Sequence, residues 1–585
     1  MGTSGAANDD ASDIKKNIDG VVDRNTSHVN AVRIRPPLST PQSPFAFGLR
    51  QCPANLRFDM LGRYWTSVLI PALVFSVSSS GLAGAPRPDR HVVIVVWDGM
   101  RPDFVAEKTT PTLWKLAREG VTFRNHHPVY LSATMVNGTA LMTGVYPGRS
   151  GVIANYEYRP EIDPKRSINV ESLSAVGKGD ELSGGKYISV PTIAELIQRG
   201  GGRTAIASAK TVGLLLDRYA GIGPAKDCVT LFAGLTVPPD ALVPIVTALG
   251  PFPSVRSQHD AWTTKAVTNV LWKDGVPALS VVWLGEPDLT QHETAPGAPP
   301  ALAAIKSSDE NLAAVLSALD KQGVRAKTDV FVVSDHGFST IARSIDLRKI
   351  LNDAGFGAKT ELDDQPKSGE IMLVGNGGSV LFYVVGHDAM VTRRLVEFLQ
   401  QSDFAGVIFT KEGLPGTFDL KQAKIDSANA NVPEVVMAFR WNNSKNQFGA
   451  PGLIDADWQR KAGEGTHASL SRFDMHNTLV AAGPDFRRGQ TDDLPTGNVD
   501  LSPTILHILG IKPSQEMDGR VLSEAMVMMD GPADTPKTET KTIEAKKDFP
   551  SGSWRQSLQV SQIGSTIYLD EGGGSFALKA GGSSH

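Results

Sequence analysis

Six side chains of metal-binding type recur in four short stretches of the sequence. Three of these stretches place an aspartate or a histidine just after an apolar run, and the fourth lies in a turn flanked by glycine. The six residues are Asp98, Asp288, His292, Asp335, His336 and His467. Mixed carboxylate and imidazole ligation suits Zn²⁺ and tolerates other divalent ions. Together with one further oxygen ligand, this set predicts a site for two divalent metal ions.

The spacing within these stretches supports a shared site, although each stretch has a simpler explanation by itself. Asp288 and His292 are four residues apart, so one helical turn would place both on the same face. A lone aspartate after a strand often caps the next helix, and Asp-His-Gly is common in turns. The carboxyl ends of parallel strands, however, meet at one edge of a sheet, where α/β proteins bind ligands. That placement favours a joint metal site.

A hydroxyl group lies close to this candidate site in the sequence. Thr134 begins a helix-like run over 134–142, and Asn137 follows one turn later. A strand-tip carboxylate at Asp98 and a hydroxyl at a helix N-terminus are typical of metal-assisted phosphoryl transfer. Two metal ions about 4 Å apart can activate an attacking oxygen and stabilise the leaving group of an anionic ester. The residues therefore predict the cleavage of phosphate esters.

The elements that must position these side chains alternate between strands and helices. The predicted strands cover 92–97, 121–123, 203–208, 278–284, 329–334 and 477–482, and the predicted helices cover 111–119, 134–142, 191–199, 258–273, 311–319 and 501–509. Apolar, β-branched runs such as 92–97 indicate strands that are buried on both faces. The alternation predicts an α/β fold with a mainly parallel sheet covered on both sides.

The region after the fifth predicted strand changes character. It predicts a smaller α+β insertion, with strands over 371–374, 380–385, 407–410 and 435–439 and a helix over 389–400. We expect a polar linker over 530–550 and a β-hairpin or disorder in the tail. The predicted order of domains is a catalytic core over 86–340, the insertion over 341–465, the completion of the core over 466–530, and a linker and C-terminal tail over 531–585.

The N-terminal region reads as two segments. Residues 1–59 are polar and without periodicity, which indicates disorder or an extension upstream of the true start. Residues 60–85 carry a positive charge at Arg63, a short apolar core and a small-residue cleavage pattern, which predict a signal peptide. A membrane anchor or a buried helix is the alternative. Cleavage would make the protein periplasmic or secreted, with no stable membrane span.

Composition limits the partners of the chain. The formal net charge of −4 gives no electrostatic argument for a surface that binds nucleic acid or anionic membranes. Phosphate affinity must therefore be local, from metal ions or helix ends. Two cysteines, Cys52 and Cys228, exclude a disulfide framework.

Five motifs carry a resemblance to a known family: WDGMRPD, SATMVNGTALMTGVYPGRSG, EPDLTQH, SDHG and GTH. As a set they resemble the alkaline phosphatase superfamily, and most closely its type I phosphodiesterase / nucleotide pyrophosphatase branch. The similarity spans roughly residues 91–525. It implies a three-layer sandwich and a metal-dependent hydrolase that cleaves phosphodiester or nucleotide pyrophosphate bonds in a small phosphate ester or nucleotide.

The resemblance also implies individual roles for the site residues. One Zn²⁺ would be held by Asp98, Thr134, Asp335 and His336, and a second by Asp288, His292 and His467. Thr134 would be the nucleophile, forming a phosphothreonine intermediate that water then hydrolyses. Asn137 aligns with an asparagine that donates to a phosphoryl oxygen, and the Met135 amide at the helix start would assist it.

The sequence departs from the branch near the nucleophile. Met135 and Val136 stand where the branch has an aromatic residue and a proline, so the leaving-group pocket differs. Ser132 is a rival nucleophile. Leaving-group specificity would lie in 155–190, a polar stretch that could form a flap near the site, and in the insertion.

The sequence also differs from related monoesterases in the cationic residues that would bind the substrate phosphate. Related threonine monoesterases grip phosphate with a Lys-x-Arg pair, whereas Lys165 and Arg166 are adjacent and would diverge in an extended segment. A diester carries one charge less and needs no such clamp, which favours a phosphodiesterase. The alternatives are a phosphomonoesterase, a phosphonate hydrolase or a phosphotransferase of the same superfamily, and a non-catalytic envelope binding module.

Overall fold

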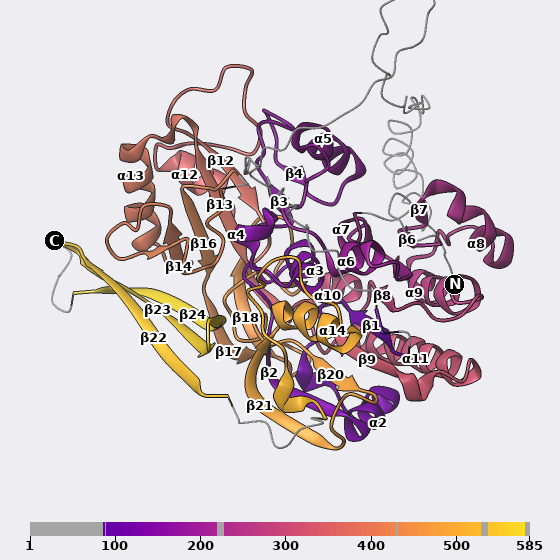
Figure 1. Cartoon of the computed structure of the whole chain (residues 1–585). Coiled ribbons are helices and arrows are strands. Elements are labelled where there is room, and N and C mark those ends of the chain that lie inside the picture. The colour runs from indigo at the N-terminus through magenta and orange to yellow at the C-terminus, as the bar shows by residue number, and fades with distance from the viewer. Residues whose placement is uncertain (1–85, 88, 219–226, 429–430, 528–535, 580–585) are drawn as a thin grey trace, which may run out of the picture. The chain divides into compact units, whose positions relative to one another are not determined.

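The structure is a computed structural model, and it describes residues 86–579 except 88, 219–226, 429–430 and 528–535 (Figure 1). The predicted N-terminal extension, 1–59, and signal peptide, 60–85, lie outside the described residues. Within the described part of the chain, no helix combines the length and the apolar character needed to cross a membrane.

The core contains a nine-stranded sheet. Its strands are β1 (His91–Trp97), β2 (Val121–His127), β5 (Thr204–Ser208), β6 (Val229–Phe232), β7 (Leu235–Val237), β8 (Leu279–Leu284), β9 (Thr328–Val333), β20 (Leu479–Ala482) and β21 (Gln490–Gly497). They are ordered β21-β2-β20-β9-β1-β8-β5-β6-β7. β1 pairs in parallel with β8 and β9, and only β20 and β7 run antiparallel to their neighbours. The predicted, mainly parallel sheet is confirmed.

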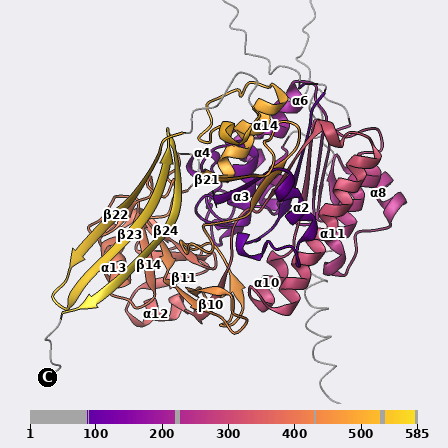
Figure 2. The same cartoon turned by 90° about the horizontal axis from the view of Figure 1, so that it is seen from below.

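Helices cover both faces of this sheet, which gives three layers (Figure 1 and Figure 2). Alternate residues of β1 point to opposite faces, as the period of a strand requires. Val92 and Ile94 pack in one apolar layer with α3 (Thr134–Thr143), α6 (Ile193–Arg199) and α14 (Leu501–Leu509). Val93 and Val95 pack in the other layer with α2 (Pro111–Glu119), α9 (His259–Lys265) and α11 (Pro299–Lys321). The sequence prediction of an α/β three-layer sandwich is confirmed.

Two helix predictions need correction. The single helix predicted over 258–273 is a 3₁₀ turn, Arg256–Gln258, followed by α9 and a π-helical segment, Ala266–Leu271. The helix predicted over 311–319 extends from Pro299 to Lys321, because proline is accepted at the first helical position and begins it much earlier.

The predicted insertion contains a six-stranded sheet ordered β11-β12-β13-β16-β14-β15. Its elements are β11 (Gly357–Lys359), β12 (Glu370–Gly375), β13 (Ser379–Val384), β14 (Ala405–Thr410), β15 (Phe418–Asp419) and β16 (Val435–Phe439), with α12 (Leu347–Asp353) and α13 (Ala389–Gln400). All four strands and the helix predicted here are present. The fully buried strands β13, β14 and β16 explain why their apolar runs were readable from the sequence.

A four-stranded sheet joins the two ends of the insertion. It is ordered β17-β18-β10-β19, with β10 (Ser339–Ser344), β17 (Trp441–Lys445), β18 (Pro451–Ala456) and β19 (Gly465–Thr466). β10 follows the SDHG motif, β19 precedes His467, and Ser339 pairs with Thr466. This pairing brings two sequence motifs together that lie about 130 residues apart in the chain.

The C-terminal region is more ordered than the sequence indicated. In place of the polar linker predicted over 530–550, the described part forms β22 (Thr538–Asp548), which joins β23 (Gly552–Ile563) and β24 (Thr566–Leu578) in a three-stranded antiparallel sheet. β23 and β24 are the hairpin that we considered for the tail. β23 and β24 lie beside β14 (Figure 2), and Leu558 and Leu569 belong to the same buried apolar cluster as Val407 and Phe409. β22 is largely exposed, so its charged sequence resembles a linker.

Candidate active site

The structure brings all seven predicted metal ligands to one edge of the central sheet. Asp98 directly follows β1, and Asp335 and His336 follow the neighbouring β9. Asp288 begins α10 (Asp288–Thr294), after β8 on the other side of β1. Three adjacent parallel strands thus deliver the three carboxylates to the same edge, as the strand-tip rule requires. His292 lies one turn along α10, and His467 follows β19.

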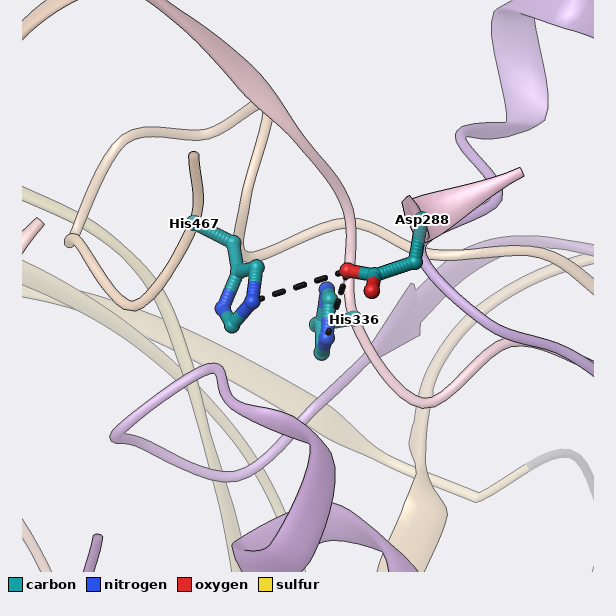
Figure 3. Close-up of side chains that lie close together, drawn as sticks. All are labelled: Asp288, His336 and His467. Carbon is teal, nitrogen blue, oxygen red and sulfur yellow. Dashed lines mark ion pairs between the residues drawn. The ribbon is translucent and has the colours of Figure 1, made fainter. Parts of the chain in front are cut away.

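The ligand atoms lie close together. His336 Nε2 is 3.3 Å from Asp335 Oδ2, 3.6 Å from Asp98 Oδ1 and 4.0 Å from Asp288 Oδ1. His467 Nε2 and His292 Nε2 lie 3.6 Å and 3.3 Å from the same oxygen of Asp288. Figure 3 shows His336 and His467 both directed at the Asp288 carboxylate. Two overlapping sets, Asp98 with Asp335 and His336, and Asp288 with His336 and His467, have the spacing of metal ligands.

The three histidines share one tautomer. His292 Nδ1 lies 3.0 Å from the Gly465 carbonyl, His336 Nδ1 lies 2.9 Å from that of Gly337, and His467 Nδ1 lies 3.0 Å from that of Ser132. A carbonyl only accepts, so each Nδ1 carries the proton. Each Nε2 is then the ring nitrogen that faces the carboxylates and the one through which a neutral ring would bind a metal ion.

Each aspartate has one oxygen held by the protein and one oxygen that accepts no hydrogen bond. Asp98 Oδ2 accepts from Trp283 Nε1 at 2.8 Å, and Asp335 Oδ1 accepts from Gly99 N at 3.0 Å. The opposite oxygens, Asp98 Oδ1, Asp288 Oδ1 and Asp335 Oδ2, are buried and without a partner among the described residues. Burying a carboxylate oxygen unpaired is costly, and a cation offsets that cost. The donor set therefore fits divalent metal ions.

Burial favours the neutral form of His467, the histidine that follows β19. It lowers the pKa of His467 well below its ordinary value, and the neighbouring His336 and His292 lower it further. A neutral imidazole at neutral pH is the form that can donate its lone pair. His467 is thus available as a ligand over the whole physiological range.

Lys210 is a site residue that the sequence reading missed. It follows β5, and its Nζ lies 2.9 Å from Asp98 Oδ2, 3.0 Å from Asp288 Oδ2 and 3.5 Å from Thr134 Oγ1. Although burial opposes it, the charges of Asp288 and Asp98 raise the pKa of Lys210 well above its ordinary value. The same strand-tip rule that found Asp98 could have found it, since 203–208 was already a predicted strand.

Thr134 lies at the start of α3, beside the candidate metal ligands. Ala133 before it is extended, and the Thr134 side chain is buried with its Oγ1 3.2 Å from His336 Nε2. Ser132, the rival nucleophile, instead donates its hydroxyl to the Ser469 carbonyl at 2.9 Å. The geometry therefore favours Thr134 as the hydroxyl of the site.

The structure contradicts the role expected for Asn137. Its Nδ2 donates to the carbonyls of Val129, Leu131 and Ala133, and its Oδ1 accepts from Val129 N and Asn498 Nδ2. The amide is therefore fully used in holding the loop that leads to Thr134. It is a positioning residue, and no donor remains for a phosphoryl oxygen.

Asn155 lies between the start of α3 and a cavity beside the candidate metal ligands. Its Oδ1 accepts from Met135 N at 2.9 Å, which also occupies the amide that we expected to assist the reaction. Because Oδ1 is held, Nδ2 is the free end of the side chain. Asn155 lines a cavity of about 180 Å³ together with His292, His467 and Met135. Part of the 155–190 stretch thus borders the site, as we considered.

Two buried side chains connect the motifs behind the site. Asn498 Nδ2 donates to Asn137 Oδ1 at 2.9 Å and to the Asp335 carbonyl at 2.7 Å. The Asp474 carboxylate accepts from the hydroxyls of Ser339 and Ser469, both at 2.5 Å. The first pair of bonds joins α3 to the SDHG loop, and the second joins the start of β10 to the segment after His467.

Other candidates lie elsewhere. Lys165 and Arg166 pair at the surface with Asp364 and Glu361, away from the metal ligands. His476, the closest rival to His467, contacts Asn125 and His127 instead. Neither group contributes to the site.

Comparison with known proteins gives a consistent result. The sequence model of the type I phosphodiesterase / nucleotide pyrophosphatase family matches residues 92–450. Bis(5'-adenosyl)-triphosphatase enpp4 of Xenopus laevis is 23% identical over 431 residues, which cover 72% of this chain and 78% of that protein. Ectonucleotide pyrophosphatase/phosphodiesterase family member 7 of Homo sapiens is 22% identical over 520 residues, which cover 86% and 99%.

Solved structures support the fold. Murine ectonucleotide pyrophosphatase / phosphodiesterase 5, solved as an inactive variant in complex with AMP, superposes with a TM-score of 0.53 at 18% identity. The alignment covers 75% of this chain and all of that chain. The family match spans more than half of the sequence and includes six of the seven clustered ligands. The chain therefore belongs to the type I phosphodiesterase / nucleotide pyrophosphatase family of the alkaline phosphatase superfamily, a family of phosphoric ester hydrolases.

Proposed function

We propose that the chain hydrolyses phosphodiester or nucleotide pyrophosphate bonds at a two-zinc centre, through an intermediate in which the phosphoryl group is bonded to Thr134. The observation that carries this proposal is the position of the Thr134 hydroxyl, 3.2 Å from His336 Nε2, which itself lies within 4.0 Å of three carboxylate oxygens without a hydrogen-bond partner in the described part of the chain. A hydroxyl buried among candidate metal ligands can be activated for nucleophilic attack by the ion that it binds.

The ligands divide into two groups in the proposed site. Asp98, Thr134, Asp335 and His336 would hold one ion, and Asp288, His292 and His467 the other. When bound, two Zn²⁺ ions would favour the ionised threonine and neutralise charge on the phosphoryl group. Asp288 Oδ1 and His336 Nε2, 4.0 Å apart, lie where the two groups meet.

The chain's own residues then perform the two half-reactions. Thr134 Oγ attacks phosphorus, so a bond from phosphorus to Thr134 forms as the bond to the leaving oxygen breaks. Water next attacks the same phosphorus and returns the threonine hydroxyl, while the product leaves as a phosphate monoester. Asn155 Nδ2 and the Lys210 ammonium are the donors near the phosphoryl oxygens, and they stabilise the charge that develops there.

Several observations favour a nucleotide diester as the substrate class. The names of the relatives describe nucleotide pyrophosphatases and a bis(5'-adenosyl)-triphosphatase, and the solved neighbour is in complex with AMP. The adjacent Lys165 and Arg166 pair with surface acids, and Lys210 is the cation beside the Thr134 hydroxyl. One ammonium matches the single charge of a diester. A phosphomonoesterase or phosphonate hydrolase is the alternative.

We further propose a periplasmic or secreted location.

A substrate panel tests this proposal. Zinc-loaded protein is assayed with bis(4-nitrophenyl) phosphate, with the 4-nitrophenyl ester of a nucleoside 5'-monophosphate, and with 4-nitrophenyl phosphate. We expect the two diesters to be hydrolysed with kcat/KM at least about tenfold above that of the monoester. Faster hydrolysis of the monoester would assign the chain to the alternative, and an undiminished rate in excess chelator would exclude the metal centre.

A further inference from the structure

Glu171 is a buried carboxylate that the proposed reaction does not use. It follows β4 (Ile168–Asn169) and is 7% exposed. Its Oε1 accepts from the Thr211 hydroxyl at 2.5 Å, whereas its Oε2 is buried and accepts no hydrogen bond from the described residues. An unpaired carboxylate oxygen is costly to bury, so a donor from outside the chain would stabilise it.

The position of Glu171 indicates where that donor would come from. Glu171 lines the same cavity as Asn155, His292 and His467, and therefore faces the space that adjoins the proposed metal centre. Because Oε1 is fixed by Thr211, Oε2 is the oxygen available to a molecule in the cavity. A substrate whose phosphorus lies beside Thr134 would extend its remaining groups into this space.

The second carboxylate of the cavity, Asp457, differs in this respect. Its two oxygens accept from Gln459 N, Gln459 Nε2 and Gly377 N, at 3.0, 2.9 and 2.8 Å. Its hydrogen-bonding capacity serves to hold the turns of the insertion. Of the two acidic side chains that line this cavity, Glu171 is therefore the one with a carboxylate oxygen that accepts no hydrogen bond from the described residues.

The surrounding charges indicate a neutral donor. Arg460 lines the cavity as well, and Lys210 is close enough to Glu171 for its charge to counteract the rise in pKa that burial causes. Two cations flanking the space disfavour an ammonium ligand, while the amides of Asn155, Asn169 and Asn376 line it with neutral polar groups. This environment suits hydroxyl groups such as those of a ribose.

We propose that Glu171 Oε2 accepts a hydrogen bond from a sugar hydroxyl of the substrate, and so makes the enzyme selective for ribonucleotide esters. This inference rests on the proposed function. A site built to hydrogen-bond a hydroxyl rejects analogues that lack it, because the polar group is then left buried and unpaired. Glu171 thus acts on specificity and takes no part in the bond-breaking step.

The test uses Glu171→Gln, which keeps the shape of the side chain and replaces the acceptor Oε2 by a donor. Its substrates are the 4-nitrophenyl ester of adenosine 5'-monophosphate, the 2',3'-dideoxy form of that ester, and bis(4-nitrophenyl) phosphate. We expect kcat/KM to fall about 10- to 100-fold on the ribose ester, as for a lost hydrogen bond to a charged group, and less than about twofold on the other two. Glu161→Gln, at an exposed position nearby, is the control and should leave all three rates unchanged.

Two results would overturn the proposal. An equal loss on all three substrates would show that Glu171 acts only by fixing Thr211 and the neighbouring Lys210, and no loss on any would show that it is idle. A measurement on the zinc-loaded wild-type protein is independent of the variant: calorimetry should show AMP binding at least about tenfold more tightly than 2',3'-dideoxy-AMP. Equal affinities contradict the proposal. If the wild-type protein with two zinc ions hydrolyses none of the three esters, the proposed function itself fails.

Discussion

His336 and His467 stack with their ring centroids 3.8 Å apart and their planes inclined by 25°. Each ring uses its Nδ1 proton on a backbone carbonyl. Both Nε2 atoms lie within 4.0 Å of Asp288 Oδ1. The stacked pair therefore connects the SDHG loop to the segment that follows β19. The Nε2 atoms of both rings face the same carboxylate, that of Asp288.

Removing one of these rings should remove one metal ion. In His467→Ala the ligand group around Asp288 loses a member, so we expect zinc content after dialysis to fall from two per chain towards one, with affinity weakened by more than about tenfold. Mass spectrometry of the metal content measures this. His507→Ala, at an exposed position on α14, is the control and should retain two ions. Unchanged zinc in His467→Ala contradicts the assignment.

Lys210 should stabilise the metal-free protein and oppose metal binding. In Lys210→Met the carboxylates of Asp98 and Asp288 lose their buried cation, so the unfolding free energy of the metal-free protein should fall by about 3–5 kcal/mol. Zinc should bind more tightly, because no ammonium repels it. The rise in thermal midpoint on adding zinc should therefore be larger than in wild type, whereas Lys349→Met on the surface of α12 should match wild type. Identical rises would refute this role.

The two asparagines near Thr134 should respond differently to the same change. Asn137→Asp places a carboxylate against three carbonyls, so the unfolding free energy should fall by about 2–3 kcal/mol in urea denaturation. Asn155→Asp keeps the acceptor for Met135 N and loses the free donor, so kcat/KM should fall about 100-fold with little loss of stability. The reverse pattern would restore Asn137 as the residue that contacts the substrate.

Acid should destabilise the core through a histidine outside the site. Burial lowers the pKa of His126 from 6.5 to about 3, although its bond to Asn498 acts in the opposite direction. Since the folded pKa lies below the unfolded value, this contribution to stability is complete above pH 6.5 and is lost as the pH falls towards 3. In metal-free protein, His126→Gln should reduce the slope of unfolding free energy against pH between 6 and 4 by about 1.4 kcal/mol per pH unit. Parallel curves would show that His126 is not responsible.

The sequence was sufficient to predict the sheet and the gathering of the candidate ligands at one of its edges. Strands such as β1 and β9 are buried on both faces, so their apolar runs are visible, and their carboxyl ends mark the site without any tertiary information. Asn137 and Asn155 could not be distinguished in this way. Both follow Thr134 closely in sequence, but only the folded loop after α4 (Pro147–Ser150) returns Asn155 to the start of α3.

The C-terminal sheet contains a strand, β22, that could not be predicted from the sequence. β22 is rich in threonine, lysine and glutamate with few apolar residues, and most of its side chains are exposed, so its sequence matches that of a linker. Its strand conformation depends on eleven paired positions with β23, whose Trp554 is fully buried. Pairing of this kind is set by a partner strand and leaves little trace in the composition of the edge strand.

The most direct measurement for the central claim is the rate of diester hydrolysis by Thr134→Ala, with Thr134→Ser as the matched variant that keeps a hydroxyl. Both proteins are loaded with zinc, and their metal content is measured on the same samples. The account predicts that Thr134→Ala retains zinc but loses at least about 1,000-fold in kcat, as for loss of a nucleophile, while Thr134→Ser keeps measurable turnover. Hydrolysis by Thr134→Ala at a rate near that of wild type would contradict it.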